Sequence, residues 1–304
     1  MLKRMRSFLV LVMLFIAVTM SAQVTTATMS GKVTAQDEPI IGATVVAVHE
    51  PSGTRYGTVT NVSGQFNLQG MRTGGPYKVE ISYVGYQTAI YKGINLLLGE
   101  NYVLNVSLKE SSELLDEVVV TASKESNMKS DRAGAIMNAN RDMINSTPTI
   151  SRSISDIMRL SPQGADVGNG FAVGGGNYRQ SFVTVDGAAF NNTFGLGGNL
   201  PANGSPISLD ALEQVTVAVT PFDVRQSGFT GGAINAVTRS GDNQFRGTAY
   251  MYFNNENLKG SKVDDYELLR SKAQYYTYGA SFGGPIIKDK LFFFVNGEYE
   301  DNVT

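Results

Sequence analysis

Three segments near the C-terminal end of the chain alternate apolar and polar residues with the two-residue period of a β-strand. In the first segment, Phe245, Met251 and Phe253 share one face, and Arg246 and Thr248 share the other. Amphipathic segments of about ten residues are typical of strands that cross a membrane in a β-barrel. A soluble β-sandwich alternates similarly, but aromatic residues near the strand ends favour the barrel. The three segments comprise residues 244–253, 274–282 and 291–300.

Residues 242–304 are therefore expected to form the first strands of an incomplete outer-membrane β-barrel. Three strands cannot close a barrel, and an open sheet in lipid would leave backbone hydrogen-bonding groups without partners. We accordingly expect the chain to be the N-terminal part of a longer protein, with further strands beyond Thr304.

The composition fits a mainly β chain and excludes several kinds of site. The 304 residues include 33 glycines and no tryptophan, which suits a chain rich in strands and turns. Cysteine is absent, so disulfides, thiolate zinc sites and thiol catalysis are excluded. The formal net charge of −2 is too small to suggest a nucleic-acid partner. The length allows two or three domains.

The N-terminus has the features of a secretory signal peptide. Basic residues within 3–6 precede an apolar run over 7–18, and Ser21 and Ala22 provide small side chains at the end. The apolar run is shorter than the ~20 residues that a transmembrane helix needs, which argues against an anchor. We therefore expect residues 1–22 to be removed on export.

Residues 23–109 are predicted to form a small β-sandwich. The Asn61–Gly64 turn allows the chain to reverse into the strand that carries Phe66, since glycine adopts positive φ angles readily. Regular short strands separated by such turns are typical of a sandwich. His49 is the only histidine of the chain, and we expect it to lie on the surface. The predicted strands are 29–34, 43–48, 57–60, 65–68, 77–83 and 102–108.

A short strand-like segment lies within the polar connector at residues 110–129. Its β-branched run has strong strand propensity, and we expect it to have no strand partner within its own domain. Because an unpaired strand invites pairing with another chain, this segment is a candidate for strand donation to a partner protein. The alternative is an interdomain strand that packs on the sandwich. The candidate residues are Leu115, Asp116, Glu117, Val118, Val119, Val120 and Thr121.

Residues 130–241 are predicted to form a mixed α/β domain. A short helix is expected over 151–160, where Ser151 or Ser153 provides the N-cap. One or two further helical turns are expected over 209–214. The first helix is expected to face inward with Ile154, Ile157, Met158 and Leu160.

Strands of this domain are expected at 181–187, 215–219 and 231–239. The first of them ends in an Asp186-Gly187 pair, which favours a tight hairpin turn. The three units together predict a mainly β protein with an N-terminal sandwich, a mixed α/β domain and the first strands of a barrel.

The sandwich resembles the carboxypeptidase regulatory-like domain, a small transthyretin-like fold. This domain also occurs beside metallocarboxypeptidases, but a chain with one histidine has no His/Glu zinc-ligand set. The glycines at 174–176 are not followed by the Gly-Lys-Ser/Thr of a phosphate loop. We therefore expect neither an enzyme nor a cofactor. The segments that carry the resemblance are 31–33, 39–45, 60–66 and 83–86.

The order of the segments resembles that of the TonB-dependent outer-membrane receptors of the Bacteroidetes type, and most closely the Oar-like subgroup. Residues 115–122 are similar to a TonB box, and residues 220–225 and 283–294 are similar to Oar-like segments. Residues 183–187, 209–217 and 231–238 resemble landmarks of a plug domain. The landmark residues are Asp186, Gly187, Gly231 and Gly232.

The resemblance implies a receptor that takes up a ligand across the outer membrane, energised by TonB pulling on the plug. It implies that the chain resides in the cell outer membrane, with the sandwich and the TonB box in the periplasm. The implied partners are TonB, outer-membrane lipid and a transported ligand such as a glycan, peptide or siderophore. A surface lipoprotein is a further candidate partner. The alternative function is a surface adhesin or glycan-binding module that uses the N-terminal sandwich.

Overall fold

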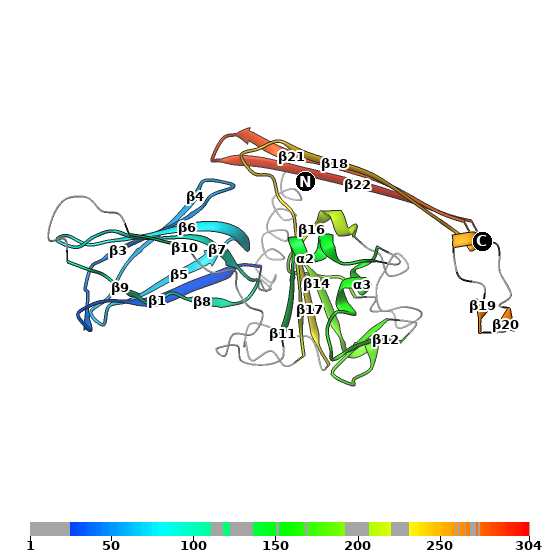
Figure 1. The fold of residues 1–304 in the computed structure, drawn as a ribbon, viewed down its shortest axis with the longest axis horizontal. Helices are drawn as coiled ribbons and strands as arrows, with labels where there is room; N and C mark the ends of the chain where they lie inside the picture. Colours follow the sequence, from blue (N-terminus) through cyan, green and yellow to red (C-terminus); the bar gives the residue numbers. More distant parts are fainter. Residues whose placement is uncertain are drawn as a thin grey trace, which may run out of the picture.

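The chain is mainly β, as expected, and its described elements form a sandwich, a central α/β domain and a long three-stranded sheet that runs along the central domain and extends beyond it on the side away from the sandwich (Figure 1). Among the residues that the computed structural model describes, no helix is long and apolar enough to cross a bilayer. The predicted signal peptide and residues 220–225 lie outside the described part. That part comprises residues 25–110, 118–121, 136–149, 152–167, 170–191, 207–219, 231–258, 260, 262–264, 266–267, 272 and 274–303.

The sandwich consists of two sheets that enclose an apolar core. In one sheet the order is β2-β1-β5, and β8 and β9 both pair with β1. In the other sheet the order is β10-β7-β6-β3-β4. Met29, Val45, Tyr77 and Ile81 are fully buried between the sheets. The strands are β1 Ala27–Ala35, β2 Glu38–Pro39, β3 Thr44–His49, β4 Thr54–Val59, β5 Gln65–Met71, β6 Gly74–Ser82, β7 Ala89–Leu96, β8 Asn101–Val103, β9 Val106–Ser107 and β10 Val118–Thr121.

Two features of the sandwich differ from the sequence expectations. The prediction contains no strand at β7, because Lys92-Gly93 interrupts the alternation of apolar and polar residues there. Gly93 has a φ of +78°, which bends the strand without ending its pairing with β6. The expectation that His49 lies on the surface was wrong, since this side chain is only 3% exposed. It is the last residue of β3 and packs against Tyr77.

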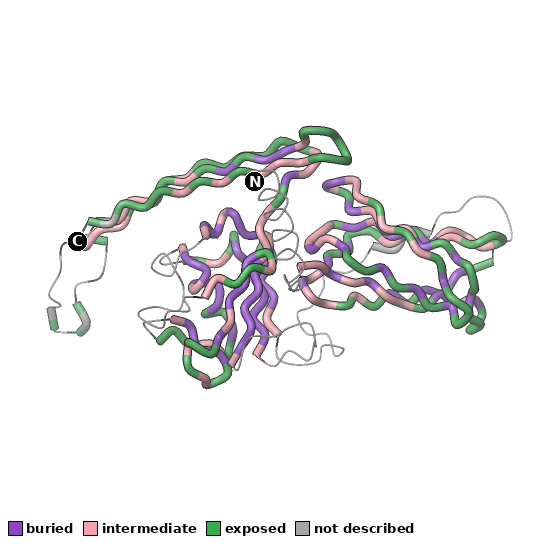
Figure 2. Tube along the Cα trace, turned by 180° about the vertical axis from the view of Figure 1, so that it is seen from behind, coloured by how far each residue is buried: buried purple, intermediate pink, exposed green. Residues whose placement is uncertain are grey.

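The central domain is built on one five-stranded sheet of order β11-β16-β17-β14-β15. The core of this sheet holds Leu212, Val215 and Ile234, together with Ile157 and Met158 from a short helix. Figure 2 shows the dense buried region of this domain beside the more exposed long sheet. The elements are β11 Ile136–Asn140, α2 Arg141–Ser146, α3 Ile154–Met158, β12 Gly164–Asp166, β13 Phe171–Val173, η1 Tyr178–Gln180, β14 Phe182–Val185, β15 Ala188–Ala189, η3 Leu209–Ala211, β16 Leu212–Ala218 and β17 Ala233–Thr238.

The predicted helix over 151–160 is shorter in the structure, where α3 covers five residues. Ser153 is its N-cap, and the Asp156 side chain accepts a hydrogen bond from the Ser153 backbone N–H. The helix buries Ile154, Ile157 and Met158 as expected, but Leu160 lies beyond its end and is exposed. The inward orientation predicted for Leu160 was therefore wrong.

The long sheet pairs its strands in the order β18-β21-β22, antiparallel throughout. β18 has the 10 residues of its predicted segment but begins and ends two residues later, whereas β21 and β22, at 14 and 13 residues, are longer than predicted. Phe245, Met251 and Val295 are more than half exposed, as outward-facing side chains of a barrel wall would be before lipid covers them. The strands are β18 Arg246–Asn255, β21 Gln274–Ile287 and β22 Leu291–Val303, with η4 Glu256–Leu258 and a small hairpin of β19 Lys262–Val263 and β20 Tyr266–Glu267 between the first two.

Candidate coupling strand and the interfaces around it

The strand-like segment of the connector forms β10 and joins the edge of the sandwich. It runs parallel to β7, with Val118 opposite Ala89 and Thr121 opposite Lys92. The expectation that this strand has no partner was therefore wrong, and the pairing is the one that the interdomain alternative required. Leu115, Asp116 and Glu117 lie outside the described residues. The prediction that the segment is a TonB box stays a prediction.

β10 is the terminal strand of its sheet in the described part of the chain, so one of its two edges faces β7 and the other has no strand beside it there. Neighbouring residues of a strand direct their N–H and C=O groups to opposite edges. An open outer edge of this kind accepts a further strand through main-chain hydrogen bonds.

The sandwich that carries β10 is bound to the central domain. The backbone N–H of Leu98, two residues after β7, donates a buried hydrogen bond to Gln214 Oε1 on β16 at 3.2 Å. The Arg72 guanidinium donates to Ser240 Oγ after β17. Arg72 itself is held at its backbone, because its N–H donates to Tyr56 Oη and its carbonyl accepts from Tyr77 Oη.

The sandwich also contacts the turn between β21 and β22. The Asn243 N–H donates to the Pro51 carbonyl at 2.9 Å. Asn243 and Asp289 form a reciprocal pair, in which Asn243 Nδ2 donates to Asp289 Oδ1 at 2.7 Å and the Asp289 N–H donates to Asn243 Oδ1 at 2.9 Å. A Cβ atom at Gly53 would lie only 2.2 Å from Asp289 Oδ1. The loop after β3 therefore fits closely against the turn between β21 and β22.

His49 lies beneath this loop as a buried neutral side chain. Its Nδ1 is 2.7 Å from Ser52 Oγ, which in turn is 2.8 Å from Thr54 Oγ1. Burial, and after it the positive charge of Arg72, lower the pKa of His49 to about 4, while the charge of Asp242 acts in the opposite direction. Because the imidazole is neutral at pH 7, this network orders the loop without a charge.

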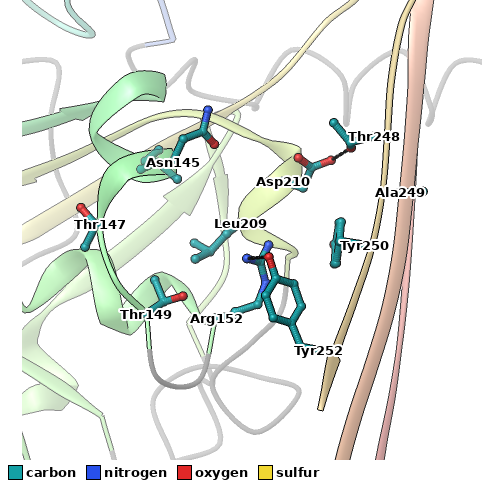
Figure 3. Close-up of a pocket in the computed structure, with 11 residues that line it drawn as sticks. Asn145, Thr147, Thr149, Arg152, Leu209, Asp210, Thr248, Ala249, Tyr250 and Tyr252 are labelled. Atoms are coloured by element: carbon teal, nitrogen blue, oxygen red, sulfur yellow. Dashed lines mark hydrogen bonds between the residues drawn. The ribbon is translucent and has the colours of Figure 1, made fainter. Parts of the chain in front are cut away.

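At Asp210, a polar contact joins the central domain to the face of the long sheet that is turned towards it. Arg141 Nη2 lies 3.0 Å from Asp210 Oδ1, and Thr248 Oγ1 on β18 donates to Asp210 Oδ2 at 2.7 Å (Figure 3). Burial alone would raise the pKa of Asp210, but hydrogen bonds from Ser281, Thr248 and Arg141 and the charge of Arg141 lower it below its usual value. The carboxylate is thus charged and bridges two elements.

A cavity of about 260 Å³ lies beside Asp210, between the central domain and β18 (Figure 3). Arg152 stands at its wall, with its guanidinium carbon 4.7 Å from the centre of the Tyr250 ring and 4.2 Å from that of Tyr252. Arg152 Nη1 also donates to Tyr252 Oη at 2.7 Å. These contacts between domain and sheet are polar and aromatic, unlike the aliphatic core of the central domain.

The four residues expected as plug landmarks lie next to the ends of β14 and β17, two neighbouring strands of the central sheet. Asp186 and Gly187 have φ angles of +48° and +80° and form the turn between β14 and β15. The Asp186 carboxylate accepts from the N–H and the hydroxyl of Thr238 at 2.9 and 2.6 Å. Gly231 N–H donates to Gln180 and the Gly232 carbonyl accepts from Phe182, so these glycines join β17 to β14.

Comparison with known proteins identifies two domains at the ends of the described fold. A family model of the carboxypeptidase regulatory-like domain matches residues 28–109. A model of an outer membrane beta barrel domain matches residues 237–304. The fold and these matches define an outer-membrane β-barrel protein with an N-terminal regulatory-like sandwich. They also confirm the expected localisation in the cell outer membrane.

The curated relatives of the chain are TonB-dependent proteins. The TonB-dependent transporter Oar of Myxococcus xanthus is 31% identical over 47% of this chain and 14% of its own length. The TonB-dependent receptor SusC of Bacteroides thetaiotaomicron is 29% identical over 84% of this chain and 24% of its own length. The chain is therefore a relative of the TonB-dependent receptors, and it spans a quarter or less of the length of these two.

The solved structure of the siderophore receptor PirA from Acinetobacter baumannii is also similar to this chain. It is 20% identical and has a TM-score of 0.44, over 55% of this chain and 24% of that chain.

Proposed function

We propose that the protein is a TonB-dependent receptor that carries a ligand across the outer membrane, and that β10 belongs to its TonB box. The observation that carries this proposal is the strand Val118–Thr121, which lies in sequence between the sandwich and the central domain and, among the described residues, has no strand on its outer edge. The TonB-dependent relatives support it. The protein acts as a transporter and not as an enzyme.

The central domain is the proposed plug, and the long sheet is the proposed start of the barrel wall. Their contacts through Asp210, Arg152 and Tyr252 support this assignment, because a plug that must move needs polar contacts that water can replace. An aliphatic interface would resist such movement more strongly.

TonB is proposed to bind by adding a strand to β10. Each main-chain hydrogen bond contributes about 0.5–1.5 kcal/mol net, so a ladder of four residues gives a transient grip. A pull along the connector then reaches β11, the first strand of the proposed plug, and deforms that domain to open a path. Asp116 and Glu117 favour a basic partner surface through charge complementarity.

Proline substitution of Val119 tests this assignment. Val119→Pro removes one ladder donor and should greatly reduce capture of the detergent-solubilised full-length receptor by the purified periplasmic domain of TonB. Val119→Thr is the matched control, because it keeps the N–H and the β-branched side chain. Both variants must reach the outer membrane at the wild-type level. Equal capture of the proline variant and the wild type would refute the assignment.

A further inference from the structure

We propose that the sandwich holds the coupling strand on β7 while the receptor is idle, and that β10 must leave β7 before a pull by TonB reaches the central domain. The inference rests on the proposed function, since it concerns the same strand. It gives the sandwich a second role. The sandwich holds β10, and β10 transmits force to the central domain only after it has been released.

The first support is the pairing itself. All four residues of β10 are in register with Ala89, Ile90, Tyr91 and Lys92, one after another along β7. A ladder of four residues is short compared with the pairing of β6 with β7 or of β3 with β6 inside the same sheet. β10 is therefore the strand of this sheet that is most easily exchanged for another partner.

The second support is that the sandwich is attached to the other two parts of the fold at residues outside β10. The sandwich contacts Asn243 through Pro51 and lies against the β21–β22 turn at Gly53, and it contacts the central domain through Arg72 and Leu98. While β10 stays on β7, tension applied to the strand is borne by these contacts. The pull therefore does not reach β11 until the ladder between β10 and β7 opens.

The contact at Leu98 also joins the sandwich to the proposed plug. Leu96 ends β7, and Leu98 donates to Gln214 on β16, which pairs with β11 through Asn140. One buried hydrogen bond thus connects the end of β7, which pairs with β10, to β16, which pairs with β11. A shift of β16 would act directly on the end of β7.

Within the part of the chain that the structure describes, the outer edge of β10 has no strand beside it, which allows a competing arrangement in which TonB adds to the strand while it stays on β7. That arrangement would load the sandwich instead of the central domain, because the ladder to β7 lies in the path of the force. We therefore assign exchange and not addition. A covalent bond between β10 and β7 separates the two arrangements.

The test uses a disulfide in a chain that contains no cysteine. Thr121→Cys and Lys92→Cys place two thiols at directly opposed positions of β10 and β7, within the Cα separation of ~4.4–6.8 Å that a disulfide needs. Lys92 is exposed, so its replacement disturbs no core packing. Thr121→Cys with Glu80→Cys is the matched control, because Glu80 lies on β6, on the far side of β7.

The full-length receptor is oxidised in the outer membrane, and the crosslink is read from its electrophoretic shift. We expect a crosslink for the 121/92 pair and none for the 121/80 pair. Capture by the periplasmic domain of TonB should then fall at least tenfold in the oxidised 121/92 variant and recover on reduction. If the 121/92 pair gives no crosslink at normal surface levels, the strand is not held on β7 and the inference is overturned.

Undiminished capture of the crosslinked receptor would also overturn it, in favour of addition to the outer edge. If the reduced receptor and the wild type both fail to bind TonB while the crosslink forms, the proposed function fails. The holding of β10 on β7 is supported in that case, and the exchange step is overturned. A second pair, Val120→Cys with Tyr91→Cys, repeats the test in the adjacent register.

Discussion

Leu98 and Gln214 are joined by a buried hydrogen bond, in which the backbone N–H of Leu98 donates to Gln214 Oε1 at 3.2 Å across the boundary between the sandwich and the central domain. The two residues are 116 positions apart in the chain. Gln214 is only 2% exposed, so its side chain is committed to this contact.

Replacing Gln214 with methionine tests this contact. The change keeps a similar volume but leaves the Leu98 N–H buried without an acceptor, which costs about 1–3 kcal/mol. We expect faster hydrogen exchange at the Leu98 amide and a lower denaturant midpoint. Glu213→Gln, on the neighbouring and less buried residue, should leave both unchanged. Unaltered protection of Leu98 in the methionine variant would show that the contact contributes nothing.

Local sequence patterns predicted the strands that alternate regularly, but they failed where a partner distant in sequence decides the structure. β7 was missed because Gly93 breaks its alternation, although the strand is held by β6 and β10 on its two sides. The predicted isolation of Val118–Thr121 was wrong for the same reason, since the partner of this strand is the missed β7.

The same limit applies to His49 and to the start of β16. His49 was expected on the surface, whereas its side chain is buried against Tyr77 and beside Ser52 of the following loop. The helical turns expected over 209–214 are reduced to the 3-10 turn Leu209–Ala211, which Ser208 caps. Pairing with β17 draws Leu212 into a strand three residues earlier than predicted.

The fit between Gly53 and Asp289 predicts that a single methyl group displaces the Asp289 carboxylate and weakens its hydrogen bond with Asn243. Gly53→Ala places a Cβ 2.2 Å from Asp289 Oδ1 at a residue with a φ of +67°. Gly42→Ala is the matched control, because Gly42 has a φ of +78° and no atom within 4 Å of the added Cβ. Backbone strain of about 1–2 kcal/mol is common to both variants.

We therefore expect Gly53→Ala to lower the free energy of unfolding by clearly more than Gly42→Ala does. Asp289→Gly in the Gly53→Ala background removes the clashing carboxylate and should recover the excess, since Asp289 itself has a φ of +61° that glycine tolerates. Equal losses for the two alanine variants would mean that the loop is not seated against the turn.

The buried His49 predicts that stability falls on mild acidification. Its pKa in the folded chain is about 4, below the ordinary value of 6.5, so protons bind the unfolded state more readily. The stabilisation is complete above about pH 6.5 and is lost as the pH falls from there towards 4, with a total of about 3 kcal/mol. His49→Gln keeps a polar side chain next to Ser52 and does not titrate.

Denaturant unfolding at pH 7.5 and at pH 4.5 measures this effect. The wild type should lose more stability between the two pH values than His49→Gln does, by an amount of the order of 2–3 kcal/mol. A parallel loss in both proteins would assign the pH dependence to other groups.

Asp210 predicts how firmly the proposed plug is attached to the barrel wall. Asp210→Asn removes the charge that Arg141 and Arg239 face at 3.0 and 3.7 Å, and both guanidinium groups are largely shielded from solvent. Breaking a buried pair by removing one partner costs about 3–5 kcal/mol, and the partial exposure of this site places the expected loss near 2–3 kcal/mol. Glu80→Gln, which breaks an exposed pair with Lys78, should cost less than about 1 kcal/mol.

The two variants are compared by the pH dependence of unfolding as well as by its midpoint. Because the pKa of Asp210 lies below its usual value, its contribution is present near neutral pH and is lost as the pH falls through that lowered pKa. Asp210→Asn should therefore be less stable than the wild type at pH 7, and the difference should shrink in acid. If the difference stays constant with pH, the loss in Asp210→Asn comes from its hydrogen bond to Thr248 instead of its charge, and the attachment of plug to wall does not depend on ionisation.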